Sequence, residues 1–396
     1  MLKNKLIAPE GTRDLLFEDC TARRQVEAHI KELLLNRGFS EIITPGIEFY
    51  DVFASEDHGI AQEKMYKLSD RKGRLLALKP DLTMPVARVA ATRLKGQTRP
   101  LRLCYDQNIY AVSQALTGRS DEIAQIGIEI IGAGGRGTDL EVLVLAVEAL
   151  QSCGLTDFRL EIGHIGIFND LIRRMNLSEE DAEEIRNLIQ TKNFPSLNDM
   201  LDRMPDQETA RMLKQLPAMF GGEEVFEQAA EVLHYGELRA DLEALRSIYR
   251  SLSELGLGDK IAIDLGIVNR NDYYTGIVFR GYVEGLGTTA LTGGRYDTLL
   301  AEYGASEPAI GFSIDADAVA KVLKSTLPEM PAPDVLVYAD EGYEVKALLE
   351  IRKLAAHGFT SEFSAFGSFD ESRRYALKKG IRTVYVVNED LVEVRL

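Results

Sequence analysis

The chain has 396 residues, of which 45% are hydrophobic and 27% are charged. This composition supports a large buried core, and the length suggests two or three domains. The 46 basic and 62 acidic residues give a formal charge of -16, so the overall field repels nucleic acid phosphates. No apolar run approaches the roughly 20 residues of a membrane span, and the first residues lack a signal-peptide pattern. We therefore expect a cytoplasmic protein.

The first predicted element is a helix over residues 18–37, which has apolar residues at helical spacing and ends at Gly38. Runs typical of strands, bounded by Gly, Pro and Asp, occur at 101–110, 123–132, 158–164, 261–266, 275–283 and 308–314. The loop between the first two strands is too short for a long crossover, which favours antiparallel pairing. We expect an α+β fold, with a mainly antiparallel sheet and flanking helices.

Two further regions depart from this pattern. Residues 166–256 are polar and helix-rich, which predicts a helical insertion; its segment 178–190 begins with a Ser N-cap and an acidic first turn. After the proline-rich stretch 327–334, strand and helix patterns alternate to the last residue. We thus expect a core over 1–326 and a small α/β domain over 334–396.

A turn that contains a carboxylate and a hydroxyl opens a predicted helix at residue 83. In 79-KPDLT-83, Asp81 and Thr83 lie where this helix begins. Such a pair can cap the helix, which is the favoured interpretation of the turn taken alone, or it can hold a ligand's ammonium group. Glu129 lies in an apolar strand, where an unpaired buried carboxylate is costly, so a binding role is favoured. Gln125 lies four residues earlier and points to the same face.

Tyr273 and Tyr274 are adjacent rings before a predicted strand. They are candidates for the aromatic wall of a pocket, and core or interface packing is the common alternative for such a pair. The three cysteines lack C-x-x-C spacing, and the five histidines show no ligand-like spacing. We expect neither a metal nor a cofactor.

Several short segments, taken together, resemble one family. They are 9-PEGTRDLL-16, 79-KPDLT-83, 125-QIGIEIIG-132, 272-DYYTGIVF-279, 292-TGGRYDTLL-300 and 308-PAIGF-312. In this order and spacing they closely resemble the catalytic core of histidyl-tRNA synthetase, a class II synthetase, over most of residues 1–325. The resemblance implies an antiparallel six-stranded sheet, an obligate dimer and a histidine pocket. It implies that the ammonium group contacts Asp81, Thr83 and Gln125. It also implies that the imidazole contacts Glu129, Tyr273 and Tyr274.

The chain departs from the synthetase pattern where ATP binds. The family holds the phosphates with arginines, because guanidinium groups stabilise the charge that develops on the α-phosphate. Counted from 118-GR-119, the strand-end motif falls on Ala111 and Ser113, and the other two arginines fall on Asp121 and Ala318. The arginine that contacts the substrate carboxylate falls on Asn269, so Arg270, one residue later, is the candidate for that contact. We expect no adenylation.

A pocket without phosphate ligands resembles a second family, the regulatory subunits of ATP phosphoribosyltransferase. This resemblance implies a non-catalytic subunit that acts in the first step of histidine biosynthesis. Such a subunit activates the short catalytic subunit and contributes to feedback inhibition by histidine. The resemblance also implies a homodimer within a hetero-oligomer, a hetero-octamer, without tRNA as a partner. Two alternatives stay open: an active histidyl-tRNA synthetase with displaced arginines, and an amino-acid ligase for another acceptor.

Overall fold

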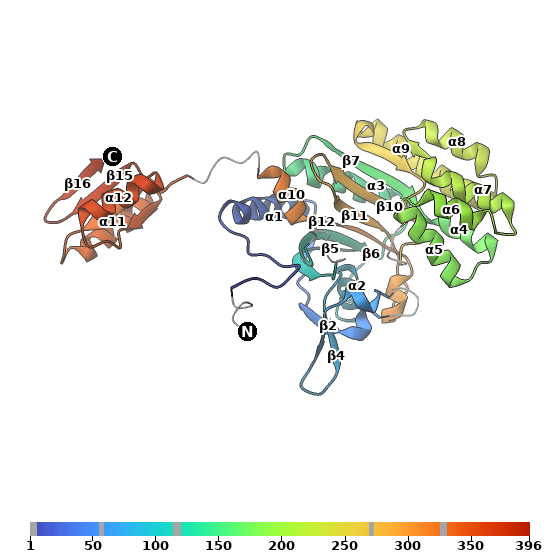
Figure 1. The fold of residues 1–396 in the computed structure, drawn as a ribbon, viewed down its shortest axis with the longest axis horizontal. Helices are drawn as coiled ribbons and strands as arrows, with labels where there is room; N and C mark the ends of the chain where they lie inside the picture. Colours follow the sequence, from blue (N-terminus) through green and yellow to red (C-terminus); the bar gives the residue numbers. More distant parts are fainter. Residues whose placement is uncertain (1–5, 55–58, 114–119, 269–272, 325–330) are drawn as a thin grey trace. The chain divides into compact units, whose positions relative to one another are not determined.

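The computed structural model describes residues 6–54, 59–113, 120–268, 273–324 and 331–396. The chain forms two compact units, Met1–Thr326 and Leu327–Leu396, and each is described by itself (Figure 1). Among the described residues, no helix has both the length and the hydrophobicity needed to cross a membrane.

A long sheet forms the centre of the first unit. Within the described residues it has nine strands in the order β1-β5-β6-β12-β11-β10-β7-β9-β8. Their bounds are β1 Ser40–Glu41, β5 Leu101–Tyr110, β6 Glu122–Ile131, β7 Phe158–His164, β8 Phe220–Gly221, β9 Ile261–Asp264, β10 Ile277–Val283, β11 Thr289–Arg295 and β12 Ala309–Asp315. The run from β5 to β7 in this order is antiparallel throughout, which confirms the predicted sheet. The parallel pairs are β1 with β5 and β7 with β9.

Side chains that alternate along each strand give this sheet two different faces. Ile126, Ile128 and Ile130 of β6 are at most 1% exposed and belong to the face covered by α1 (Glu18–Asn36), α3 (Arg136–Ser152) and α10 (Ala316–Leu323). Figure 1 shows these helices on one side of the sheet and α2 (Thr83–Thr92) on the other. Gln125 and Glu129 therefore point to the α2 side.

Helices form most of the chain between β7 and β9. They are α4 Ile165–Met175, α5 Glu179–Gln190, α6 Phe194–Leu201, α7 Gln207–Gln215, α8 Glu224–Val232 and α9 Gly236–Glu254, and Figure 1 shows them gathered at one end of the large sheet. The Ser178 hydroxyl accepts a hydrogen bond from the Asp181 N–H, and the first turn of α5 is acidic. The predicted start of this helix is confirmed.

A small sheet precedes α2 and leads into the KPDLT turn. Its order is β2-β4-β3, with bounds Ile47–Phe49, Leu75–Leu78 and Lys67–Ser69. Lys79, which follows β4, is 2% exposed, and its ammonium group donates to the Gln107 side chain of β5 at 2.5 Å. This bond anchors the turn beside the large sheet. Short 3-10 helices are η2 Tyr50–Val52, η3 Gln62–Lys64, η4 Leu216–Ala218, η5 Gly258–Lys260 and η6 Leu299–Tyr303.

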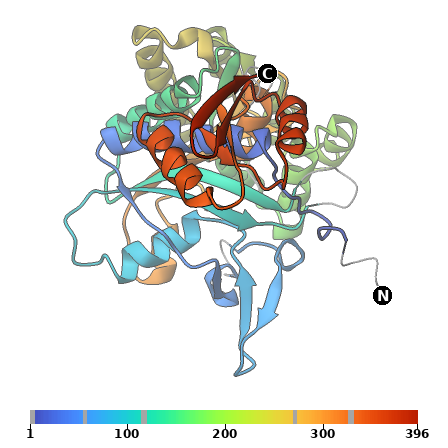
Figure 2. The ribbon, with the colours of Figure 1, turned by 90° about the vertical axis from the view of Figure 1, so that its left-hand side faces the viewer.

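The second unit is a small α/β sheet with the order β14-β13-β15-β16. Its elements are β13 Val335–Ala339, α11 Glu344–Ala356, β14 Ser361–Phe363, α12 Phe369–Lys379, β15 Thr383–Val387 and β16 Leu391–Arg395. Val337 and Leu354 belong to one buried cluster and Leu336 and Ala376 to another, so α11 and α12 pack on opposite faces of this sheet. Figure 2 shows the two helices with the strands between them.

The strand predictions missed β11, the two-residue strands β1 and β8, and the small sheet before α2. Gly293 and Gly294 make β11 look like a loop, because glycine weakens the strand pattern of a sequence. Each strand of the small sheet has at most four residues, too few to show a clear alternation. The strands at 101–110 and 158–164 have the predicted bounds.

Candidate functional site

Six of the predicted site residues line a single cleft on the α2 side of the large sheet. The cleft has a volume of about 1910 Å³. The residues are Asp81, Thr83, Gln125, Glu129, Tyr273 and Tyr274. Arg270, the predicted carboxylate contact, and Asn269 lie outside the described residues.

Glu129 lies at the bottom of the cleft and is 1% exposed. Its Oε1 accepts hydrogen bonds from the Thr83 hydroxyl at 2.9 Å and the Tyr105 hydroxyl at 3.3 Å. Its Oε2 accepts one from the Tyr296 hydroxyl at 2.5 Å. Burial raises the pKa of Glu129 to about 8, and the hydrogen bonds from Tyr296 and Thr83 only partly oppose this rise. The carboxyl group is therefore held in place without a cationic partner among the described residues.

Glycines on the neighbouring strands make the space that Glu129 occupies. Gly311 of β12 lies directly across from Glu129 in the sheet, and a Cβ at Gly311 would overlap the Glu129 Oε2. Gly294 of β11 is next in the same row, and a Cβ there would lie 2.7 Å from the ring of Tyr274. Backbone without side chains therefore lies under the site, at Gly294 of the TGGRY segment and at Gly311 of β12.

Asp81 contacts the backbone of α2 and also lines the cleft. Its Oδ1 accepts a hydrogen bond from the Met84 N–H at 2.8 Å, within the first turn of α2. Its Oδ2 faces the Tyr273 hydroxyl at 3.5 Å. Burial raises the pKa of Asp81 to about 6, while the backbone bond from Met84 opposes the rise. Asp81 therefore caps the helix, as the turn alone predicts, and leaves its second oxygen toward the cleft.

The remaining predicted residues form the walls of this part of the cleft. The rings of Tyr273 and Tyr274 lie 4.8 Å apart between centroids, and Tyr273 is 2% exposed. Gln125 lies on the same face of β6 as Glu129 and pairs across the sheet with Asp315. Hydroxyl, amide and carboxyl groups on aromatic walls suit a small ligand that carries hydrogen-bond donors at two ends.

Sequence reasoning missed Tyr105 and Tyr296, which hold the Glu129 carboxyl group. Tyr296 lies inside the quoted TGGRYD segment, but nothing in its local pattern indicates a partner 167 residues away. Tyr105 lies directly across from Gly127 of β6, and a Cβ at Gly127 would lie 2.8 Å from the Tyr105 hydroxyl. Gly127 was the local sign, in the sequence of this strand, that a large side chain from a neighbouring strand lies over it.

At the other end of the cleft, the positions expected to hold phosphate carry no arginine. Ala111, Ser113 and Ala318 line this end. Asp121 accepts hydrogen bonds from the Tyr66 hydroxyl at 2.5 Å and the Ser113 N–H at 2.8 Å. Burial alone would raise the pKa of Asp121, but the bonds from Ser113 and Tyr66 hold it below its ordinary value.

Asp121 also fixes the segment that contains PEGTRD. The Asp121 N–H donates to the Gly11 carbonyl at 2.7 Å, and a Cβ at Gly11 would lie 2.5 Å from the Asp121 carboxylate. The cleft residue Arg13 lies 3.7 Å from Asp317, an acid that Arg23 also approaches at 3.8 Å. Lys64 and Lys321 also line this end, but an ammonium group lacks the bidentate geometry of guanidinium.

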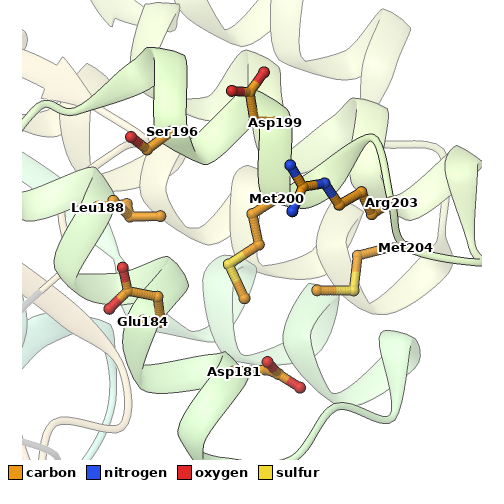
Figure 3. A pocket seen from close by; sticks show the side chains of 8 residues that line it. All are labelled: Asp181, Glu184, Leu188, Ser196, Asp199, Met200, Arg203 and Met204. Carbon is orange, nitrogen blue, oxygen red and sulfur yellow. The ribbon is translucent and has the colours of Figure 1, made fainter.

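A second, smaller pocket lies between α5 and α6 (Figure 3). It has a volume of about 460 Å³ and is lined by Asp181, Glu184, Leu188, Ser196, Asp199, Met200, Arg203 and Met204. Figure 3 shows the thioether side chains of Met200 and Met204 near one another, with carboxylates around them. This pocket contains none of the predicted site residues, so the cleft is the candidate site.

The comparisons with known proteins agree with the fold. The family model described as histidyl-tRNA synthetase matches residues 11–319. A relative from Clostridium kluyveri, an ATP phosphoribosyltransferase regulatory subunit, is 40% identical over 379 residues, covering 94% of this chain and 97% of the relative. One of the same description from Clostridium acetobutylicum is 38% identical, covering 97% and 96%.

Solved structures extend this comparison. A Bacillus halodurans structure, described as an ATP phosphoribosyltransferase regulatory subunit/histidyl-tRNA synthetase, has a TM-score of 0.83 and 28% identity, covering 96% of this chain and 97% of that one. A histidyl-tRNA synthetase from Nostoc has a TM-score of 0.76 at 19% identity, covering 98% and 96%, and so shares the fold.

The antiparallel sheet, the cleft on its α2 side and the family match define a protein of the class II, histidyl-tRNA synthetase-like type. Glu129 is present, whereas Ala111, Asp121 and Ala318 stand where the phosphate arginines are expected. The chain belongs to the family of ATP phosphoribosyltransferase regulatory subunits.

Proposed function

We propose that the chain is a non-catalytic regulatory subunit of ATP phosphoribosyltransferase and that histidine is the ligand of its cleft. In this role it binds the short catalytic subunit, activates the first step of histidine biosynthesis and contributes to feedback inhibition by histidine. The names of the relatives support the regulatory role. The proposal for the ligand depends on the site itself.

The observation that carries the proposal is the contrast between the two ends of the cleft. Asp81 and Glu129 are carboxyl groups set for a ligand with an ammonium group and a ring N–H donor. At the other end, Asp121 is held by Tyr66 and Ser113, where a synthetase needs an arginine. Each lost oxyanion-type donor costs about 2.7 to 4 kcal/mol of transition-state stabilisation. Three such losses leave binding without adenylation.

Regulation requires that histidine stabilise one of two states of the complex more than the other. We propose that the chain is a homodimer within a hetero-oligomer, and that the cleft transmits ligand binding to its contact with the catalytic subunit. Arg270, three residues before Tyr273 in the sequence, is the proposed contact for the ligand carboxylate.

The direct test is ATP phosphoribosyltransferase activity of the short catalytic subunit from the same genome. It is measured with and without this chain, across a titration of histidine. The proposal expects activation by the chain and suppression of that activation by histidine. No activation at any ratio of subunits overturns the regulatory role. Histidine-dependent exchange of pyrophosphate into ATP would instead establish an active synthetase.

A further inference from the structure

The most deeply buried part of the cleft combines acidic and hydroxyl groups, and no cation of the described residues forms an ion pair there. The groups that face Glu129 come from every element packed around it. They are Tyr105 from β5, Thr83 from α2, Asp81 from the turn before α2, Tyr274 from the segment before β10, and Tyr296 directly after β11. Tyr273 faces Asp81. Gly311 adds only backbone from β12.

Ion pairs are absent from both carboxyl groups in the described part of the chain. Lysines and arginines form bridges with Glu27, Glu48, Asp139 and many other acids, but with neither Asp81 nor Glu129. Arg280, on β10, opposes the rise in the pKa of the Tyr274 hydroxyl, so its positive charge reaches this group of rings. Two buried carboxyl groups that affect one another cannot both ionise cheaply, and the deeper one, Glu129, has the larger tendency to stay neutral.

The three hydroxyls around Glu129 suit both protonation states of the acid. A hydroxyl group donates one hydrogen bond and accepts others, and its hydrogen rotates freely. Thr83, Tyr105 and Tyr296 can all donate to a carboxylate, or one of them can accept from a carboxylic acid while the others donate. The oxygens therefore keep their positions when a proton leaves.

We infer that the empty site stores a proton on Glu129 and that the ring of the bound histidine takes this proton. The O–H bond of Glu129 breaks, an N–H bond forms on the ring nitrogen, and a carboxylate faces an imidazolium. This inference rests on the proposed function, because it assumes histidine as the ligand. Its consequence is specificity: the site selects a side chain that is a base of near-neutral strength, as well as one of the right shape.

The proton balance of binding gives a signature. The ordinary pKa of a histidine ring is about 6.5, and burial raises the pKa of Glu129 to about 8. Below about pH 7 the two free partners together hold more than one proton, so binding releases protons. Above about pH 7.5 they hold less than one, so binding takes protons up. The net exchange is close to zero between these values.

The experiment is calorimetric titration of the full-length protein with histidine at pH 6.5, 7.2 and 8.5, in two buffers of different ionisation enthalpy. The expected result is release at the lowest pH, almost no exchange at the middle one and uptake at the highest. Uptake of nearly one proton at pH 7.2 would mean that Glu129 is already ionised in the empty site, and would overturn the inference. If histidine binds in neither buffer at any of these pH values, the proposed ligand is overturned instead.

Two further measurements locate the proton in the complex. Nitrogen NMR of ring-labelled histidine should show both ring nitrogens protonated when bound at pH 7.5; a neutral bound ring overturns the inference while leaving histidine as the ligand. In addition, 2-fluorohistidine has nearly the same shape as histidine but a much less basic ring. It should bind at least tenfold more weakly than histidine. Glu129→Gln should reduce this preference to less than threefold, whereas Glu254→Gln, an exposed residue on α9, should keep it.

Discussion

Glu129 on β6 and Gly311 on β12 lie directly opposite one another, and the Glu129 carboxyl group occupies the space that a side chain at 311 would fill. The acid can therefore lie over the neighbouring strand, where Tyr296 reaches its Oε2 at 2.5 Å. The position of the acid depends on the absence of one methyl group.

Gly311→Ala should accordingly displace Glu129 and weaken histidine binding at least tenfold. Overpacking of this kind also costs about 1 to 3 kcal/mol of unfolding free energy. Binding is measured by calorimetry and stability by urea denaturation. Gly96→Ala is the matched control, because a Cβ at Gly96 meets no atom within 4 Å. Normal histidine affinity in Gly311→Ala would show that the position of Glu129 is unimportant for binding.

Asp81→Asn should separate the capping role of Asp81 from its role in binding. Asparagine caps helices about as well as aspartate, so the bond from the Met84 N–H should remain and the melting temperature should change little. Histidine affinity should fall at least tenfold, because the substitution removes the charge proposed to face the ligand's ammonium group. Asp81→Ala should lose about 1 kcal/mol of stability as well. A large drop in melting temperature for Asp81→Asn, with unchanged affinity, would leave only the capping role.

The stability of the ligand-free protein should decrease as the pH rises from 6.5 to 8. The pKa of Glu129 is about 8 in the folded protein and about 4.3 in the unfolded chain, so the folded state holds more protons in this window. Unfolding free energy then falls with pH, with a contribution from Glu129 of up to about 1.4 kcal/mol per pH unit. Urea denaturation of Glu129→Gln across the same window should show a flatter dependence. Parallel curves for the two proteins would contradict the raised pKa.

Asp121→Ala should destabilise the protein without altering histidine binding. The change leaves the Ser113 N–H and the Tyr66 hydroxyl without their acceptor, which costs about 1 to 3 kcal/mol. Asp121 is not among the proposed ligand contacts, so calorimetry should give an unchanged affinity. An equally large loss of affinity would indicate that the two ends of the cleft are coupled.

The sequence indicates which residues of a strand share a face, but it does not indicate which distant segments those residues contact. The spacing of Gln125 and Glu129 indicates a shared face because side chains alternate along a strand. The meeting of Asp81, Glu129 and Tyr273 in one cleft was predicted only from the resemblance to a known family. Local patterns gave no reason to join turns and strands so far apart.

The hydrogen bonds that hold Glu129 depend on long-range register. Tyr105 faces the site because β5 pairs with β6 so that residue 105 meets Gly127, and no local pattern sets that register. The role of Asp121 was missed for a similar reason. Its partners, Tyr66 and the Gly11 carbonyl, come from segments 55 and 110 residues away along the chain.

The attachment of Asp121 to Tyr66, Ser113 and Gly11 bears on how such a protein can evolve. If an ancestor carried arginine at this position, the replacement did more than remove a phosphate ligand, because the new carboxylate became part of the framework that holds the first segment of the chain. A single change back to arginine would break that framework before any other phosphate ligand was regained. Loss of the ancestral chemistry at this position would then be hard to reverse, since each intermediate on the way back would be less stable and still inactive.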